Sequence, residues 1–376
     1  MVVPATILED LSARKPAALA RAISLVENGS PGSEAMLAGI HPRLGAARRI
    51  GITGPPGSGK STLIERLAAQ FRAAGLTVGV IAIDPSSPFT GGALLGDRIR
   101  MERAATDPGV FIRSMASRGS LGGMATTTGE VADVMDAYGF DRILIETVGV
   151  GQSELDVASV ADTTVVVLVP ESGDGIQVMK AGLMEIADAY VVNKADRPGA
   201  DRLRQELEVA IGLKGGHAFR HMPAHHGVDL GKPAGTGAQG HGGTDKASES
   251  GRGFLAPLRP RAPVPAGVGS GEQAAWEPPV VGTVAVKDEG VGELVAALDR
   301  HHAFLASGGE LRARRTRQLE QRARDVFERA LRRWVWSDAG RKTALEGALA
   351  EVMAGRRSPY EAAAAVVERI GRGNGA

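Results

Sequence analysis

The stretch that most constrains this chain is GPPGSGKS, residues 54–61, which fits the pattern G-x-x-x-x-G-K-[ST]. A run typical of a buried strand, RRIGIT at 48–53, precedes it, and an apolar-periodic helix, STLIERLAAQFRAAG at 61–75, follows it. In such a loop the glycines let backbone N–H groups surround phosphate oxygens, and the helix N-terminus favours an anion. The sequence therefore predicts a phosphate-binding loop rather than an ordinary glycine-rich turn.

The residues of this loop have separate expected roles. Lys60 adds a positive charge for the phosphates, and the hydroxyl of Ser61 is suited to bind Mg²⁺. We expect the nucleotide to be contacted by Gly54, Pro55, Pro56, Gly57, Ser58, Gly59, Lys60, Ser61 and Thr62.

Strands and helices alternate on both sides of this loop. Further strands are predicted at 77–84, 142–147, 163–170, 189–193 and 278–286, and helices at 176–188 and 200–212. Hydrophobic residues make up 43% of the chain but aromatic residues only 4%, so the core should consist of Val, Ile, Leu and Ala. Continuous Val/Ile runs suit strands that are buried on both faces. The predicted fold class is α/β, a P-loop NTPase with a mainly parallel sheet flanked by helices.

The chain should contain three parts. Residues 5–29 have helical spacing and belong to an N-terminal helical segment, 1–47, which precedes a P-loop domain at 48–300. The third part, 301–376, reads as a C-terminal helical extension in which 311–336 has an apolar face. Residues 215–253 are rich in Gly, His, Ala and Ser, which predicts a flexible insertion within the P-loop domain.

Composition excludes several classes of function. The chain has 376 residues, no cysteine and a formal net charge of +1, so thiolate chemistry is excluded and no global charge points to nucleic acid or an anionic membrane. No apolar run approaches the roughly 20 residues needed to span a bilayer, and Glu9 and Asp10 interrupt any signal peptide. We expect a cytoplasmic protein, or an organellar one without its targeting segment, with neither nucleic acid nor membrane as a partner.

The stretch VVNKAD, residues 191–196, follows a predicted buried strand. An aspartate three residues after an asparagine is suited to accept hydrogen bonds from guanine N1–H and the exocyclic amine, a donor pair that adenine lacks. We therefore assign Asn193 and Asp196 to the base, with the stem of Lys194 lying along the ring. Following a phosphate loop in this order, the pattern favours GTP over ATP.

Acidic residues at two strand ends are candidate magnesium and switch residues. Asp84 and Glu146 end parallel strands, at the sheet edge where ligands bind, and complete a metal set with Ser61 and Asp97. For Asp97, a solvated loop acid is the alternative. After Glu146, glycines 149 and 151 permit a loop that moves with a γ-phosphate, and Gln152 either orients the attacking water or is a surface amide. The catalytic candidates are Lys60, Asp84, Glu146 and Gln152.

Several long blocks in the same order resemble the MeaB/ArgK family, which includes the methylmalonic aciduria type A protein. These blocks are GPPGSGKST, AIDPSSPFTGGALLGDRIRM, SRGSLGG, ETVGVGQSE, GDGIQVMKAGLMEIAD and NKAD. The resemblance runs from about residue 10 to 213 and resumes near FLAPLRPRAP and WEPPVV. It implies a GTPase that gates adenosylcobalamin loading and protects or reactivates an acyl-CoA mutase, usually methylmalonyl-CoA mutase. It also implies low intrinsic activity stimulated by that partner, and a homodimer formed through the C-terminal extension.

Carried over residue by residue, the resemblance implies that Lys60 and Ser61 belong to the phosphate loop. It implies that Asp84, Asp97 and Glu146 form the magnesium and switch set, and that Asn193 and Asp196 read guanine. Residues 171–182, with Gln177 and Lys180, look like the family's additional switch. Two features depart from the family. The guanine loop reads Thr283-Val284-Ala285 instead of T-S-A, which keeps backbone N–H contacts to guanine O6 but loses a serine hydroxyl, and the 215–253 insertion is unusual.

Specific residues bear on other possible functions. Five histidines of the insertion raise a metal-delivery GTPase of the HypB/UreG type as the alternative, although such composition is commonly a linker. A kinase is a third possibility, but no acceptor pocket is identifiable. The arginines of 311–336 alternate with acids and lack interleaved aromatic residues, which argues against nucleic acid. The cobalamin-ligand pattern D-x-H-x-x-G does not occur, so the cofactor should belong to the partner.

Overall fold

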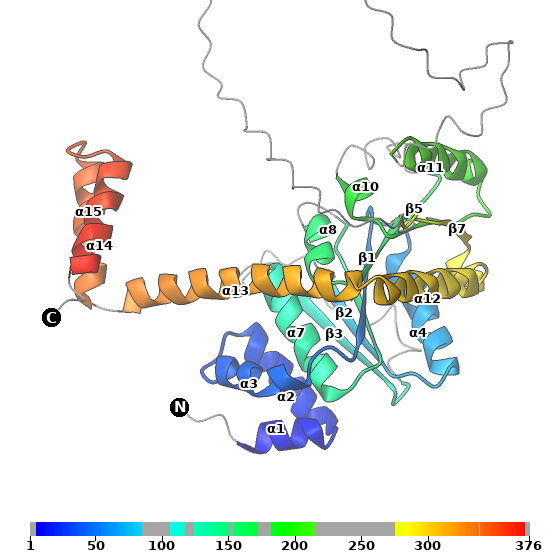
Figure 1. The fold of residues 1–376 in the computed structure, drawn as a ribbon, viewed down its shortest axis with the longest axis horizontal. Helices are drawn as coiled ribbons and strands as arrows, with labels where there is room; N and C mark the ends of the chain where they lie inside the picture. Colours follow the sequence, from blue (N-terminus) through cyan, green and yellow to red (C-terminus); the bar gives the residue numbers. More distant parts are fainter. Residues whose placement is uncertain are drawn as a thin grey trace, which may run out of the picture. The chain divides into compact units, whose positions relative to one another are not determined.

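The computed structural model describes residues 5–84, 106–116, 124–149, 153–171, 182–214, 275–337 and 339–372. Within these ranges, seven parallel strands form one sheet in the order β3-β2-β4-β1-β5-β6-β7 (Figure 1). They are β1 (Arg48–Thr53), β2 (Val78–Asp84), β3 (Val110–Ala116), β4 (Arg142–Glu146), β5 (Thr163–Leu168), β6 (Ala189–Asn193) and β7 (Val280–Thr283). The parallel pairing, with helices between successive strands, confirms the predicted α/β fold class.

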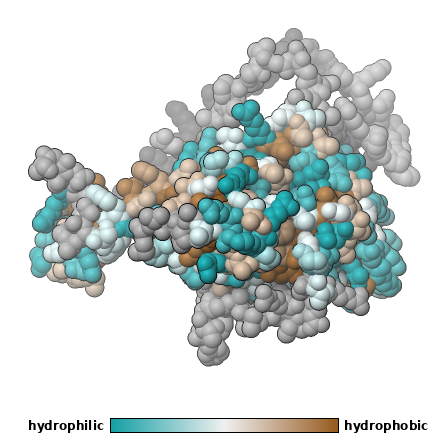
Figure 2. All heavy atoms as spheres, turned by 90° about the horizontal axis from the view of Figure 1, so that it is seen from below, coloured by the Kyte–Doolittle hydropathy of each residue, from teal (hydrophilic) through white to brown (hydrophobic). Residues whose placement is uncertain are grey.

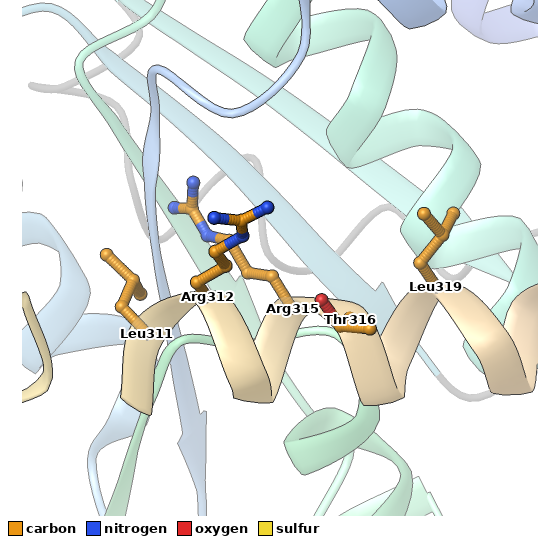
Figure 3. A pocket seen from close by; sticks show the side chains of 5 residues that line it. All are labelled: Leu311, Arg312, Arg315, Thr316 and Leu319. Atoms are coloured by element: carbon orange, nitrogen blue, oxygen red, sulfur yellow. The ribbon is translucent and has the colours of Figure 1, made fainter. Parts of the chain in front are cut away.

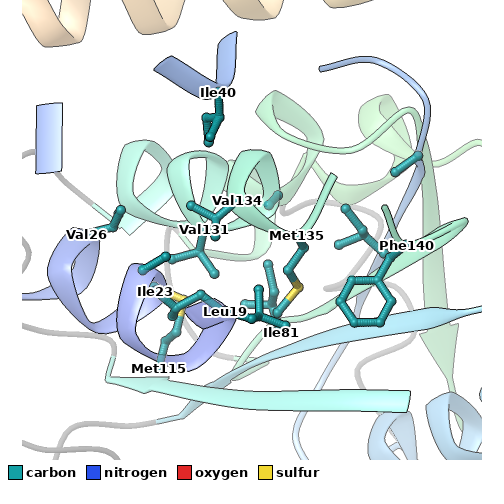
Figure 4. Packing of buried hydrophobic residues seen from close by; sticks show 14 of the residues in the cluster. Leu19, Ile23, Val26, Ile40, Ile81, Met115, Val131, Val134, Met135 and Phe140 are labelled. Atoms are coloured by element: carbon teal, nitrogen blue, oxygen red, sulfur yellow. The ribbon is translucent and has the colours of Figure 1, made fainter. Parts of the chain in front are cut away.

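Helices cover both faces of this sheet. Alternate residues of β2 and β4 belong to two different hydrophobic clusters, as the pleat of a strand requires. One cluster includes α4 (Lys60–Ala73) and α12 (Val291–Ser307). On the opposite face lie α7 (Met124–Tyr138) and the N-terminal helices, packed as in Figure 4. On that same face, α10 (Leu183–Ile186) and α11 (Ala200–Lys214) pack against β5 and β6. The aliphatic core is as the composition predicted.

The N-terminal segment is not one continuous helix over 5–29. It contains α1 (Ala5–Ser12), α2 (Pro16–Glu27), α3 (Ser33–Ile40) and the short 3-10 turn η1 (His41–Arg43). The first helix ends before Arg14, which has φ of 53°, and α2 begins with Pro16. Proline lacks an N–H and is tolerated only in the first turn of a helix, which explains the break.

Two predicted elements are shorter in the structure. The strand predicted at 278–286 ends at Thr283 and continues as a 3-10 turn, η3 (Ala285–Lys287). Of the helix predicted at 176–188, residues 182–188 are described, and only α10 is helical, because Ala187 is already extended towards β6. Strand β3 was not predicted; it lies at the sheet edge, and its mixed burial gives no continuous apolar run.

Arginines of the long helix α13 (Glu310–Ser337) form ion pairs with acidic residues next to the sheet and on α7. Arg315 forms a forked pair with Asp162, with both nitrogen–oxygen distances 2.7 Å, and Arg314 donates to Asp188 at 2.7 and 3.0 Å. Burial alone would raise the pKa of Asp188, but hydrogen bonds from His301 and Arg314 hold it below its usual value. One and two heptads after Arg315, arginines pair with acids of α7, as Arg322–Asp133 and Arg329–Glu130. The basic face of α13 is therefore a docking face within the chain.

Several apolar side chains of α13 are exposed. Among the described residues, none of its side chains is buried, and its exposed large hydrophobic residues are Leu319, Val326, Phe327, Leu331, Trp334 and Trp336. Figure 2 shows hydrophobic residues interspersed with hydrophilic ones on one side of the molecule. A cavity of about 330 Å³ lies along the helix between two leucines (Figure 3), lined by Leu311, Arg312, Arg315, Thr316 and Leu319.

Beyond α13 the chain continues as α14 (Ala339–Met353) and α15 (Pro359–Arg372). A capping box begins α15, where the backbone N–H of Ser358 donates to Glu361 and the N–H of Glu361 donates to the Ser358 hydroxyl. None of the described helices is both long and apolar enough to cross a membrane.

Replacing Asp136 with alanine should lower the free energy of unfolding by about 3 kcal/mol or more. Its buried carboxylate accepts the N–H groups of Gly45, Ala46 and Ala47 and pairs with Arg49, so the change leaves these donors without their acceptor. Chemical denaturation measures the change. Asp201→Ala, at an exposed position of α11, is the control and should stay within about 0.5 kcal/mol of wild type. An equal, small effect of both changes would contradict this role for Asp136.

Candidate functional site

The loop between β1 and α4 forms a cradle that only glycine permits at two positions. Gly54 has φ of 134°, and a Cβ there would lie 2.1 Å from the carbonyl oxygen of Val167. Gly59 has φ of 89°, and a Cβ there would lie 2.4 Å from Nδ2 of Asn193. The backbone of the loop therefore packs directly against β5 and β6. Its N–H groups lie at the start of α4, where a helix favours an anion.

The first residue of α4 is Lys60, whose side chain is buried within this loop. Its ammonium donates to the carbonyl oxygens of Gly54, at 2.8 Å, and Pro55, at 3.0 Å. These carbonyls hold the lysine over the loop, so that its charge lies next to the position expected for a phosphate oxygen. Its contact with phosphate stays a prediction.

The proposed metal ligands lie where two neighbouring strands end. Asp84 and Glu146 are the last residues of β2 and β4, and both are buried. The Ser61 hydroxyl donates to Oε1 of Glu146 over 2.7 Å, so the structure brings the helix start and the strand end together. A hydroxyl and two carboxylates supply the hard oxygen atoms that Mg²⁺ prefers. Asp97 lies outside the described residues.

The segment after β4 lies against the phosphate loop. Thr147 donates its hydroxyl to Thr53 at the end of β1, with 3.0 Å between the oxygens. At Gly149, where φ is 87°, a Cβ would lie 2.5 Å from the carbonyl oxygen of Gly54 and 2.7 Å from Nζ of Lys60. Only glycine can approach this closely. Because the segment lies against Lys60, a shift of the segment would change the surroundings of the Lys60 ammonium directly. Gly151 and Gln152 lie outside the described residues.

Asn193, at the end of β6, connects the phosphate loop to the turn that follows β7. Its Nδ2 donates to the carbonyl of Ser58 over 2.8 Å. Its Oδ1 accepts from the Thr283 hydroxyl and the Ala285 N–H, both at 3.1 Å. These three hydrogen bonds connect the two loops within the protein, and the contact of Asn193 with a base stays a prediction.

The remaining base candidates surround this junction. Lys194 has φ of 56° and lies 3.5 Å from Glu171, and Asp196 is exposed with Lys287 at 3.5 Å. The exposed carboxylate of Asp196 is accessible to a ligand, in contrast to the buried amide of Asn193. The Thr283-Val284-Ala285 stretch forms the end of β7 and the start of η3, next to Asn193.

A protein-family model described as the methylmalonyl-CoA mutase-associated GTPase MeaB matches residues 19–339 of this chain. The chain belongs to the MeaB family. A putative GTPase of Pyrococcus abyssi is 42% identical over 361 residues, which cover 92% of this chain and 95% of that protein. The GTPase ArgK of Escherichia coli is 45% identical over 184 residues, or 48% of this chain and 56% of ArgK.

The MeaB-family fold is also found in a solved structure. The crystal structure of the LAO/AO transport system kinase has a TM-score of 0.61, with 24% identity, and the match covers 98% of this chain and 99% of that one. Together with the parallel sheet, this confirms the predicted P-loop fold. The recognition of a MeaB/ArgK-type GTPase from the sequence is confirmed by the family match.

Nothing in the sequence indicates two residues of this site, one near the phosphate loop and one at the turn after β7. One is Glu154 on α8 (Ser153–Asp156), which leads into the 3-10 turn η2 (Val157–Ser159). Burial raises the pKa of Glu154, and the positive charge of Lys60 opposes that shift, so the carboxyl senses the phosphate-loop lysine. The other is Arg66 of α4, which donates to the turn after β7. In sequence both look like ordinary charged residues of amphipathic helices.

Proposed function

We propose that this chain is a magnesium-dependent GTPase that gates adenosylcobalamin loading into an acyl-CoA mutase and protects or reactivates it. Methylmalonyl-CoA mutase is the proposed partner because the family description names it. The observation that carries the nucleotide assignment is the junction at Asn193, which joins the phosphate loop at Ser58 to the turn at Ala285. Asp196, three residues further on, is the guanine-reading carboxylate.

The proposed mechanism relies on positioning and electrostatic stabilisation by the chain itself. Backbone N–H groups of residues 54–62 bind the phosphates of GTP or GDP, and Lys60 places its charge on the transferred γ-phosphoryl group. Ser61, Asp84 and Glu146, with Asp97 as the further candidate, hold Mg²⁺, which neutralises phosphate charge when bound. If removing Mg²⁺ with a chelator left hydrolysis unchanged, this part of the proposal would be wrong.

Switching is proposed for the segment that follows Glu146. The approach of Gly149 to both Gly54 and Lys60 supports a backbone that moves when the γ-phosphate is lost. Glu146 accordingly acts as a magnesium-linked carboxylate and not as a proton-transfer catalyst. Gln152 remains the candidate for orienting the attacking water.

A homodimer is proposed through the C-terminal extension. The exposed apolar side chains of α13, among them Phe327, Leu331 and Trp334, support it, whereas Arg322 and Arg329 already pair with α7 within the chain. Sedimentation velocity should detect the dimer. A monomer at all concentrations tested would contradict it, and so would a dimer that survives removal of 310–372.

The partner is tested by mixing the chain with methylmalonyl-CoA mutase and measuring GTP hydrolysis. We expect a stimulation of about tenfold or more, because a partner completes sites of this kind. Affinity capture with GDP, and with a non-hydrolysable GTP analogue, should recover the mutase in different amounts. Equal recovery in both nucleotide states, with no stimulation, would exclude the proposed mutase role. The histidines of the metal-delivery alternative lie outside the described residues.

A further inference from the structure

The second turn of α4 is connected to the loop proposed to read guanine. Nε of Arg66 donates to the carbonyl of Ala285 over 3.1 Å, and its Nη2 donates to the carbonyl of Val286 over 3.2 Å. One turn further, Gln70 donates to Asp288, which has φ of 62° and ends the same turn. A planar guanidinium that reaches two successive carbonyls fixes the orientation of both peptide groups.

The same turn is held from its other side by Asn193. This asparagine accepts from the N–H of Ala285 and donates to Ser58 in the phosphate loop. The backbone of Ala285 is therefore held at its N–H by β6 and at its carbonyl by α4. Because α4 begins at the phosphate loop, the loop is connected to the turn after β7 both through Asn193 and through α4. These two connections set the distance between the phosphate and base subsites.

The orientation of this turn bears on which base can bind. At the start of η3 the N–H of Ala285 donates to Asn193 and that of Lys287 donates to Val284, which leaves the N–H of Val286 facing a ligand, in the same peptide group as the Ala285 carbonyl that Arg66 binds. Such an N–H group is matched by the carbonyl oxygen O6 of guanine and not by the amine of adenine. Val284 contributes no hydroxyl in this loop, so recognition of O6 rests on the backbone of the turn, whose direction Arg66 and Asn193 fix.

We propose that Arg66 is a positioning residue for guanine selectivity, aligning the backbone N–H of Val286, in the turn after β7, with O6 of the base. The inference rests on the proposed GTP-binding function. It assigns Arg66 a role through Ala285 and Val286, with no contact of its own to the nucleotide.

The test uses wild-type protein and Arg66→Ala with four nucleotides, and reads the dissociation constant from calorimetric titration. GTP is compared with 6-thio-GTP, whose sulfur is a weak acceptor at position 6, with ITP, which lacks the amine read by Asp196, and with ATP. Arg66→Ala should weaken GTP and ITP by about tenfold each but 6-thio-GTP by less than about twofold. The ratio of GTP to 6-thio-GTP affinity should then fall, whereas the ratio of GTP to ITP affinity stays constant.

Two variants serve as controls. Arg72→Ala removes another partly buried arginine of α4, which pairs with Asp107 away from the turn, and should leave all four dissociation constants unchanged. Arg66→Lys keeps the charge but lacks the fork, so it should show an intermediate loss. If Arg66→Ala does not fold, Arg66→Lys carries the same comparison. Equal weakening of GTP and 6-thio-GTP, or no weakening, would overturn the positioning role. A wild-type protein that binds ATP as well as GTP would instead overturn the proposed function.

Discussion

Replacing Lys60 with alanine should lower the rate constant of GTP hydrolysis by at least about 100-fold. The ammonium lies within the loop, held 2.8 Å from the carbonyl of Gly54 and 3.0 Å from that of Pro55, so its charge is already positioned before the nucleotide arrives. A preorganised charge costs little reorganisation when negative charge builds on the transferred phosphoryl group. Single-turnover hydrolysis with saturating GTP separates this loss from weaker binding.

The matched control for this change is Lys342→Ala. Lys342 is an exposed lysine of α14, 3.9 Å from Glu346, and its removal should leave the hydrolysis rate within about twofold of wild type. Thermal unfolding of both variants shows whether the fold is kept. A folded Lys60→Ala protein that hydrolyses GTP as fast as wild type would mean that the phosphate loop is not the catalytic site.

The sheet was predictable because its strands are buried on both faces and leave continuous apolar runs. β2, β5 and β6 consist almost wholly of buried residues, and each was placed within two residues of its end from sequence. The edge strand β3 could not be predicted, because it is partly exposed and its sequence contains the polar residues Arg113 and Ser114. In the sequence between β2 and β3, no apolar periodicity indicates a strand.

The site was predictable where its residues have fixed spacing along the chain, as in the phosphate loop and at residues 193–196. It was not predictable where the contact depends on how elements pack. Arg66 reaches a turn more than 200 positions away, and Arg322 reaches Asp133 from a helix whose arginines resemble a solvated surface. A charged residue in an amphipathic helix has no sequence signal that distinguishes solvent from a distant backbone carbonyl as its partner.

Replacing Asp196 with asparagine should change which base is bound. A carboxylate accepts from both guanine N1–H and the exocyclic amine, whereas an amide offers one acceptor and one donor. The amide NH₂ then faces the guanine amine, and we expect GTP affinity to fall by about 100-fold. Xanthine carries a carbonyl where guanine carries the amine, so XTP should gain affinity in the same variant. Because Asp196 is exposed and its contact with Lys287 is long, at 3.5 Å, the fold should tolerate the change.

Calorimetric titration of GTP and XTP against wild type and Asp196→Asn measures this exchange of selectivity. Asp201→Asn, an exposed acid at the start of α11, is the control and should keep the wild-type preference for GTP. The sign of the XTP change distinguishes two explanations for a loss of GTP binding. A distorted site would lose both nucleotides, whereas a site in which residue 196 faces the base must gain XTP as it loses GTP. If a variant that keeps the wild-type fold weakens both equally, Asp196 does not read the base, and guanine selectivity would have to come from the turn at Ala285 alone.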